Sequence, residues 1–500
     1  MPSNQPIVET TNGSLRGATN DGIAVFRGIR YGAPTGGANR FRPPQPVEPW
    51  MGVRDADAFA QTAPQQFSFL ALGGTKGNRP TIGEDCLGLN VWTPGCDDAR
   101  RPVMVWFHGG GFEAGTGSME LYGGDRLARR GDVVVVTVNH RLGVLGHLHL
   151  DHLLDDVAGS ANVGFLDLAA ALEWVRDNIA GFGGDPGNVT IFGQSGGGRK
   201  VSLSMAAGRT EGLFARGIVQ SGSHLRLIET ERAADNADRF LAKLGLADPR
   251  ALIDVPMDDL LAAAGRAWGR FAPAIDGVVF DDHPWSPQAP AWSAGLPMLV
   301  GTCRTEQSGL LPLGEPALLD LPEGDLDRRL GDWFPSDDVP ALVELIRDER
   351  PDASAAEVFF TLTTDRSYWL DSLLQLEAKV GQRAGPAWSY QVTWRTPVDG
   401  GRTFSPHSLD LPFVFDNVAV AADQVGEPTP ETAAMAETMS ETWLAFARTG
   451  DPNHAGIPRW PTYDLDRRAT LHLDVPPTVV DDPHAAERLA MSRYPTRQAT

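Results

Sequence analysis

Two kinds of hydrophobic pattern alternate along the chain. Short apolar runs rich in β-branched residues are separated by longer stretches in which apolar residues recur every three or four positions. The short runs lie at residues 103–107, 133–138, 189–192, 217–220 and 298–301. Continuous apolarity is typical of central parallel strands that helices cover on both faces. The pattern therefore predicts an α/β fold with a central, mostly parallel β-sheet.

The longer stretches predict helices that flank or overlie this sheet. Two of them carry apolar stripes at helical spacing and end in Gly- and Pro-containing turns. The stripes are Leu168, Leu172, Val175 and Ile179 in the first, and Met435, Met439, Trp443 and Phe446 in the second. The segments near 225–270 and 310–385 are rich in helix formers and acidic residues. We expect them to be helical insertions above the sheet, within a single domain that spans residues 1–500.

Composition and charge exclude several kinds of partner. The chain has 500 residues, 42% hydrophobic and 21% charged, which is typical of a globular protein with a substantial core. Its formal net charge of −21 opposes binding to nucleic acid and to anionic membranes. The N-terminus lacks a basic segment followed by an apolar one, no run approaches the roughly 18 apolar residues of a membrane span, and three cysteines are too few for a disulfide scaffold. We therefore expect a cytoplasmic protein, and the oligomeric state stays open.

A histidine-rich stretch raises the hypothesis of a metal-dependent hydrolase. Residues 147–152 read "HLHLDH", a spacing typical of dinuclear metal sites, and His224 and His283 could supply further ligands. The alternative is that these histidines are solvated or locally hydrogen-bonded in a surface turn and helix.

A second stretch predicts a serine nucleophile. "VTIFGQSGGG" places Ser195 at the centre of G-x-S-x-G, directly after an apolar run and before a predicted helix. A sharp strand-to-helix turn lifts such a hydroxyl above the sheet, and flanking glycines relieve the crowding. An ordinary glycine-rich turn is the alternative interpretation.

A glycine run after another predicted strand complements this serine. In "VMVWFHGGGFEAG", backbone N–H groups can point into a site without obstruction by side chains, where they would stabilise charge on a carbonyl oxygen. The amides of Gly110, Gly111 and Gly196 are the predicted oxyanion hole, whereas His108 is expected to shape the loop. Arg199 and Lys200 are expected to be structural or solvent-facing, without a chemical role.

Long ordered motifs resemble the type-B carboxylesterases, the family that includes the cholinesterases, over nearly the whole chain. They are "FRGIRYGAPTGGANRFRPPQP", "EDCLGLNVWTP", "VNHRLGVLG", "NVGFLDLAAALEWVRDNIAGFGGDPGNVTIFGQSGGG", "HSLDLPFVF" and "WLAFARTGDPN". The resemblance implies an α/β-hydrolase fold with helical insertions over the active site. It also implies hydrolysis of a small-molecule ester through an acyl-enzyme on Ser195, with no cofactor and no metal.

The resemblance also assigns the partners of the serine. The family's histidine motif falls on His407, and its acid falls on Glu306 in "GTCRTEQSGLL". The sequence departs from the family at Thr305 and Gln307, where Asp and Gly are usual. A rival carboxylate is Asp276 in "AIDGVVF", a match that implies a structural turn.

Three weaker correspondences follow from the resemblance. Ser221 resembles a family serine that supports the catalytic acid without contacting the substrate. The alternative is that its hydroxyl lies at the end of a strand and is bonded to the backbone. Cys86 matches a half-cystine, but the partner region "TAPQQF" has no cysteine, so no bridge is expected. The segment 67–86 lacks the tryptophan that binds choline in cholinesterases, so choline esters are not the expected substrates.

Three hypotheses therefore differ in how much of the chain they explain. The metal hypothesis explains six residues, whereas the serine carboxylesterase hypothesis explains six separate stretches. The third hypothesis is a catalytically inactive binding homologue, which would lack the nucleophile. The chain retains Ser195, Glu306 and His407, so a serine carboxylesterase is the favoured interpretation.

Overall fold

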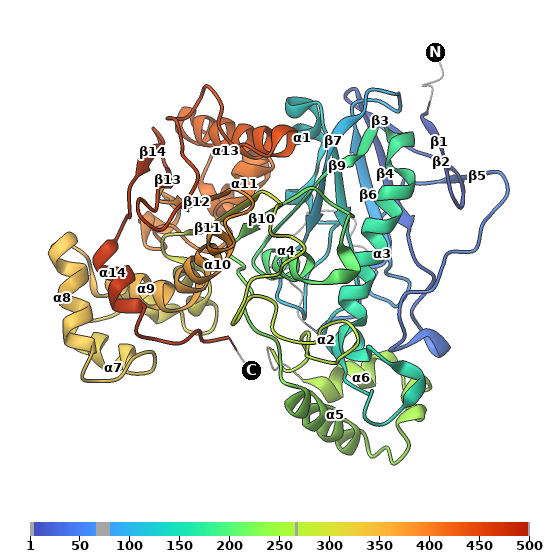
Figure 1. Cartoon of the computed structure of the whole chain (residues 1–500), viewed down its shortest axis with the longest axis horizontal. Helices are drawn as coiled ribbons and strands as arrows, with labels where there is room; N and C mark the ends of the chain where they lie inside the picture. Colours follow the sequence, from blue (N-terminus) through green and yellow to red (C-terminus); the bar gives the residue numbers. More distant parts are fainter. Residues whose placement is uncertain (1–4, 67–80, 266–268, 499–500) are drawn as a thin grey trace.

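An eleven-stranded sheet crosses the molecule and organises the other elements (Figure 1). The computed structural model describes residues 5–66, 81–265 and 269–498. In this part of the chain, the strands of the large sheet are β3 (Ala18–Asn20), β4 (Ile23–Arg30), β6 (Gly88–Thr93), β7 (Arg101–Phe107), β8 (Val134–Val138), β9 (Gly184–Gln194), β10 (Arg216–Gln220), β11 (Met298–Cys303), β12 (Ala387–Val392), β13 (Thr470–Leu473) and β14 (Thr478–Val480). A small second sheet contains β1 (Ile7–Thr10), β2 (Gly13–Arg16) and β5 (Val53–Asp55).

The centre of the large sheet is parallel and its borders are antiparallel. The spatial order is β14-β13-β12-β11-β10-β9-β7-β8-β6-β4-β3. All pairs from β13 to β8 in this order are parallel, while β14, β6, β4 and β3 pair with antiparallel neighbours. The five apolar runs all lie within β7 to β11, so the predicted mostly parallel sheet is confirmed.

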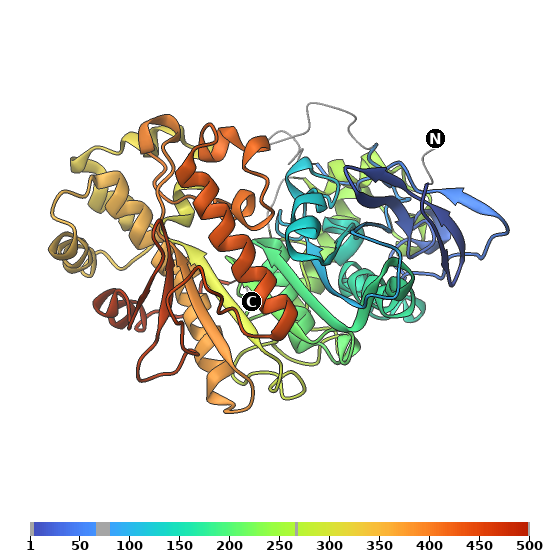
Figure 2. The ribbon, with the colours of Figure 1, turned by 90° about the horizontal axis from the view of Figure 1, so that it is seen from above.

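Helices cover both faces of this sheet. One face carries α3 (Val163–Asn178), α4 (Gly196–Ala206) and α10 (Leu370–Gly381); the other carries α1 (Asp125–Gly131), α11 (Leu411–Val414) and the long helix α13 (Pro430–Thr449), which Figure 2 shows lying against the strands. Both apolar stripes are helical, as predicted. The first lies in α3 and in the turn that follows it, and the second lies in α13.

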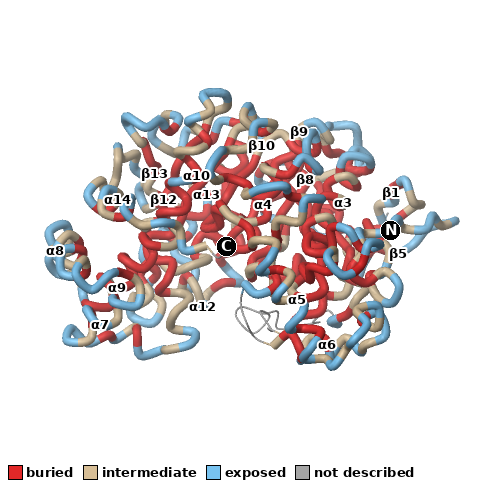
Figure 3. The backbone as a smooth tube through the Cα atoms, turned by 60° about the horizontal axis from the view of Figure 1, so that its bottom comes forward, coloured by how far each residue is buried: buried red, intermediate tan, exposed pale blue. Residues whose placement is uncertain are grey.

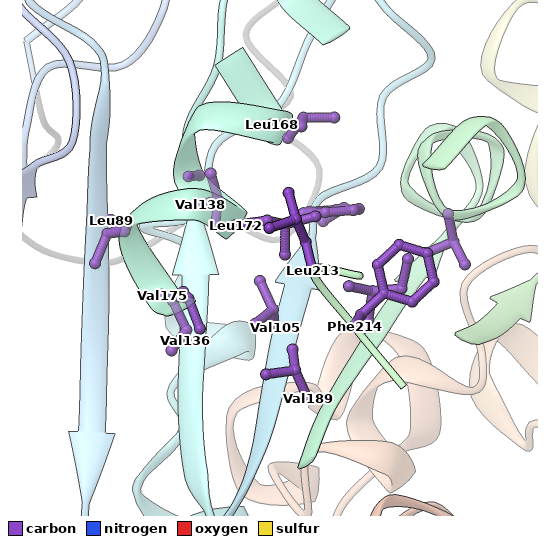
Figure 4. Packing of buried hydrophobic residues seen from close by; sticks show 14 of the residues in the cluster. Leu89, Val105, Val136, Val138, Leu168, Leu172, Val175, Val189, Leu213 and Phe214 are labelled. Atoms are coloured by element: carbon purple, nitrogen blue, oxygen red, sulfur yellow. The ribbon is translucent and has the colours of Figure 1, made fainter. Parts of the chain in front are cut away.

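Alternating strand residues supply the two cores. Val105 and Val136 point toward Leu172 and Val175 of α3 (Figure 4), whereas the intervening Trp106 packs in the core beneath α13. Each fully buried side chain of this size contributes about 1.5–3 kcal/mol relative to an exposed one. Figure 3 shows that burial is concentrated where the strands meet these helices.

The two segments predicted as insertions are helical. The first forms α5 (Thr230–Leu244) and α6 (Met257–Ala264); the second forms α7 (Leu326–Leu330), α8 (Val339–Glu349) and α9 (Ala355–Thr364), which continues through a π-helical turn into α10. The second segment differs from expectation at its end, because α10 packs against β11 and β12 and covers the sheet itself. The remaining helices are α2 (Gly143–His147), α12 (Ala422–Val425) and α14 (Ala485–Met491). None of the helices in the described ranges is both long and apolar enough to cross a membrane.

Candidate active site

Ser195 lies at the turn between β9 and α4. Its backbone has φ 58° and ψ −124°, a conformation that costs a non-glycine residue about 1–3 kcal/mol and is stored at functional sites. The Ser195 amide donates to the carbonyl of Gln220 on β10 at 2.8 Å. Gly197 permits the tight turn, because a Cβ there would lie 1.9 Å from the carbonyl oxygen of Phe107. The sequence thus folds here as the motif predicts.

Glu306 and His407 meet beside this turn. Glu306 follows β11 by three residues and is fully buried; its Oε1 accepts the amide of Cys303 at 2.7 Å. Its Oε2 lies 2.5 Å from Nδ1 of His407, which stands in the loop between β12 and α11. The amide of His407 also donates to the Glu306 carbonyl at 3.2 Å. Backbone and side chain together therefore orient the imidazole.

A cavity of about 870 Å³ brings four of the predicted site residues together, while Gly196, Ser221 and Glu306 do not line it. Ser195, His407, Gly110 and Gly111 all line it. The ring of Tyr368, which follows α9, lies with its centroid 5.0 Å from that of His407. Residues from four distant parts of the sequence thus share one concave site.

The glycine loop presents unpaired amides to this cavity. Gly110 has φ +96°, and a Cβ there would lie 2.3 Å from the carbonyl oxygen of Ala114. Gly196, the first residue of α4, presses on the loop so closely that a Cβ would lie 2.2 Å from the Gly111 oxygen. Within the described residues, the amides of Gly110, Gly111 and Gly196 donate to no acceptor. These three amides are therefore available as hydrogen-bond donors.

Lys200 holds the glycine loop from behind. It is only 1% exposed, and its Nζ donates to the carbonyls of His108 at 2.9 Å and Gly111 at 3.0 Å. Burial lowers its pKa well below the usual value, and so does the neighbouring charge of Arg199. Of the two expectations for Lys200, the structural one holds and the solvent-facing one is wrong, because α4 packs directly beneath the loop.

His108 is a neutral part of the same loop. Its ring stacks on that of His140, with centroids 4.8 Å apart, and its Nδ1 lies 2.8 Å from the Gly109 carbonyl. Burial and the charge of Lys200 lower its pKa to about 3. The imidazole is therefore uncharged at neutral pH.

A second buried carboxyl lies behind the histidine. Asp410 is fully buried and its Oδ2 accepts Nε2 of Gln220 at 2.7 Å. Burial raises its pKa to about 6, and the charge of Glu306 adds to this. Sequence reasoning did not single out Asp410, although it stands three residues after His407.

Ser221 lies buried after β10, but its Oγ forms no hydrogen bond with any described residue, so the contact with the acid is not seen.

Among the described residues, the histidine-rich stretch assembles no set of metal ligands, and only part of it is buried. His147 and His149 are 4% and 3% exposed, so solvation is wrong for these two; the alternative of a hydrogen bond holds for His147, which bonds the Ala161 carbonyl at 3.0 Å and packs edge-on against Phe112. His152 is exposed, and its Nε2 lies 3.1 Å from Oδ1 of Asp238, so the expectation holds there. Among described residues, three potential ligand atoms converge only at Glu349, His484 and Glu487. That group stands beside Arg304, which already pairs with Glu487.

Three further sequence interpretations concern residues around the site. Asp276 holds a turn, because its Oδ1 accepts the amides of residues 278–280, and Glu306 is the carboxylate that contacts His407. Cys86 is buried and unpaired. Residues 67–80, on which the expectation about choline esters depends, lie outside the described residues.

The C-terminal segment completes the cavity wall, which no local sequence pattern indicates. Gln498 lines the cavity, donates to the Ser223 carbonyl at 2.7 Å and accepts the Leu225 amide at the same distance. Gln498 and Thr496 also donate to the two oxygens of Asp371, a buried carboxyl whose pKa burial raises to about 6.

Comparisons with known proteins show the family of the chain. The pattern that defines the carboxylesterase family matches residues 4–492. The chain is 36% identical over 497 residues to the para-nitrobenzyl esterase of Bacillus subtilis (strain 168), covering 96% of this chain and 97% of that one. It is 33% identical over 494 residues to the phenmedipham hydrolase of Pseudarthrobacter oxydans, covering 93% and 94%.

Solved structures give the same result. The crystal structure of a Geobacillus stearothermophilus carboxylesterase aligns with a TM-score of 0.84 and 37% identity, covering 97% of this chain and 99% of that chain. The expected α/β-hydrolase fold is confirmed, and neither the metal-dependent nor the inactive hypothesis is favoured. The chain belongs to the carboxylesterase family and is a carboxylic ester hydrolase.

Proposed function

We propose that the protein hydrolyses small-molecule esters through an acyl-enzyme on Ser195. His407 removes the hydroxyl proton as Ser195 Oγ bonds to the carbonyl carbon, and the carbonyl π-electrons move onto oxygen. The amides of Gly110, Gly111 and Gly196 donate to this oxyanion. The oxyanion collapses, the C–O bond to the alcohol breaks, and His407 protonates the leaving oxygen.

The second half-reaction repeats these steps with water. His407 takes a proton from water, the resulting hydroxyl adds to the acyl carbon, and Ser195 leaves with the proton that His407 returns. Glu306 stays ionised and stabilises the imidazolium in both halves. The contact of 2.5 Å between Glu306 Oε2 and His407 Nδ1, beside a cavity that Ser195 lines, carries this proposal.

The cavity suits aliphatic or aromatic esters of small to medium size. Its wall includes the apolar side chains of Phe112, Ile228, Ala272, Leu310 and Leu313. A volume of about 870 Å³ is within the range of small-molecule sites. The Bacillus relative is named for para-nitrobenzyl esters, so nitrobenzyl and nitrophenyl esters are suitable first substrates.

The proposal is tested by setting serine reagents against chelators. An organophosphate or sulfonyl fluoride should abolish hydrolysis of p-nitrophenyl acetate, and EDTA should leave the rate unchanged. If EDTA abolishes the activity and the sulfonyl fluoride leaves it intact, a metal-dependent hydrolase is favoured instead. If neither a burst nor a steady release of nitrophenol is seen, the protein is an inactive binding homologue.

A cytoplasmic location is part of the proposal. Cys86, Cys96 and Cys303 are all free thiols, and Cys96 is exposed, which suits a reducing compartment. Fractionation of the native cells, with thiol labelling of Cys96, tests this location.

A further inference from the structure

Arg199 brings a positive charge into the wall of the active-site cavity. It is the fourth residue after Ser195, and its amide donates to the Ser195 carbonyl at 3.0 Å in the first turn of α4. Residues four apart lie on the same face of a helix. The side chain of Arg199 is half-buried and lines the same cavity as the hydroxyl of Ser195. Its charge is therefore close to the position of the bound ester.

The Arg199 guanidinium has no ion-pair partner among the described residues, although its charge lowers the pKa of the Asp371 carboxyl in the same cavity, against the larger rise that burial causes. Among the residues that the structure describes, no carboxylate pairs with the Arg199 side chain and no acceptor takes a hydrogen bond from it. A charge removed from water is normally paired. By contrast, the other exposed or half-buried arginines nearby have contacts: Arg226 bonds His283, and Arg497 lies over the ring of Trp333.

The carboxyls that line the cavity are poor counter-charges. Glu113 accepts the Gly269 amide at 2.6 Å, and burial raises its pKa to about 7. Both oxygens of Asp371 already accept hydrogen bonds, from Thr496 and Gln498. The cavity thus contains three arginines against two weakened acids, in a chain whose net charge is −21. The excess of positive charge in the cavity wall is therefore not a consequence of the overall composition, which is acidic.

We propose that Arg199 binds a carboxylate carried by the substrate, so that the preferred substrates are esters with a second, ionised carboxyl group. This inference rests on the proposed function. A guanidinium binds a carboxylate through two parallel N–H···O bonds, and the apolar residues around the cavity strengthen the attraction. The carboxylate can belong to the acid part or to the alcohol part of the ester. The chemistry of recognition is the same in both cases.

Two matched pairs of esters test the inference and identify the side. In the alcohol arm, 4-acetoxybenzoate is compared with methyl 4-acetoxybenzoate; in the acid arm, monoethyl adipate is compared with diethyl adipate. In at least one arm, kcat/KM of the wild type should be about tenfold or more higher for the anionic ester. This corresponds to one charge-assisted hydrogen-bond pair.

Variants locate the effect at Arg199. Arg199→Gln should lower kcat/KM for the preferred anionic ester about tenfold or more and change the neutral ester less than about threefold, whereas Arg199→Lys should keep most of the preference. Arg209→Gln is the matched control, because Arg209 is exposed and pairs with Glu173 away from the cavity. Thermal midpoints of the variants establish that each is folded.

The outcomes separate this inference from the proposed function. Wild-type preference for the neutral ester in both arms would overturn the inference and leave the esterase intact. An equal effect of Arg199→Gln on both members of a pair, or no effect, would also overturn it. Failure of the wild type to hydrolyse any ester, p-nitrophenyl acetate included, would overturn the proposed function itself.

Discussion

Lys200 Nζ donates a hydrogen bond to the carbonyl oxygen of Gly111 at 3.0 Å. The helix that begins after Ser195 therefore also fixes the loop that carries the unpaired amides. Lys200 bonds the carbonyls of His108 and Gly111, while the amides of Gly110 and Gly111 donate to no acceptor within the described structure. One helix thus couples the position of Ser195 to that of the unpaired amides.

Replacing Lys200 should reduce the chemical step more than substrate binding. Lys200→Met keeps the length of the side chain but removes both hydrogen bonds, so the loop is no longer held in place. Loss of one oxyanion donor typically reduces kcat about 10²–10³-fold, and we expect a reduction of at least about tenfold with little change in KM. Steady-state kinetics with p-nitrophenyl acetate measure both constants.

Lys379 offers a matched control for this prediction. It is also buried, and its Nζ donates to the carbonyls of Ser293 and Ala294, at 3.0 and 2.6 Å, away from the glycine loop. Lys379→Met should lower the thermal midpoint and leave kcat within about twofold. If both variants lose kcat equally, Lys200 acts only through general stability.

Glu306 and Asp276 can be distinguished by a pair of amide substitutions. Glu306→Gln should lower kcat about 10³–10⁴-fold, because an amide neither stabilises the imidazolium nor fixes the correct tautomer of His407. Asp276→Asn should leave kcat nearly unchanged and lower the thermal midpoint, since it weakens a turn. The reverse pattern would show that Asp276 is the acid of the site.

The buried carboxyl of Asp410 predicts a pH-dependent stability. Its pKa is raised to about 6 in the folded state by burial, against about 3.9 when unfolded. Between pH 4 and 6 the folded state binds more protons than the unfolded state, so this group lowers stability as pH rises. A difference of about two pH units between the folded and unfolded pKa values corresponds to about 3 kcal/mol in the free energy of unfolding. Asp410→Asn removes the effect.

The Asp410 prediction is measured as a difference between proteins. The stability of Asp410→Asn relative to the wild type should increase by about 3 kcal/mol from pH 4 to pH 7. Thermal midpoints of both proteins across this range, in one buffer series, provide the comparison. A midpoint difference that is constant with pH would contradict the raised pKa.

The sheet and the turn that carries Ser195 were predictable because their determinants are local. Each of the five apolar runs is a strand, and the strand-turn-helix context around Ser195 is contained in a dozen residues. His407 and Glu306 have no local pattern of their own, since they meet only after β11 and β12 pair. Their assignment required resemblance to a family.

The features that sequence reasoning missed depend on packing between distant segments. Lys200 follows another cation, a pattern that suggests a solvated surface, yet the packing of α4 against the glycine loop buries it. The burial of His147 has the same origin, because the residues that it contacts, Ala161 and Phe112, lie outside its own stretch. Gln498 enters the cavity wall from the far end of the chain. Neither periodicity nor spacing encodes such contacts.

The proposed acyl-enzyme mechanism depends most directly on the hydroxyl of Ser195. The measurement is kcat for p-nitrophenyl acetate hydrolysis by purified Ser195→Ala, with a thermal midpoint that matches the wild type. We expect kcat to fall by about 10⁴-fold or more, because loss of the nucleophile removes the acyl-enzyme route. A folded Ser195→Ala protein that hydrolyses the ester as fast as the wild type would contradict the account.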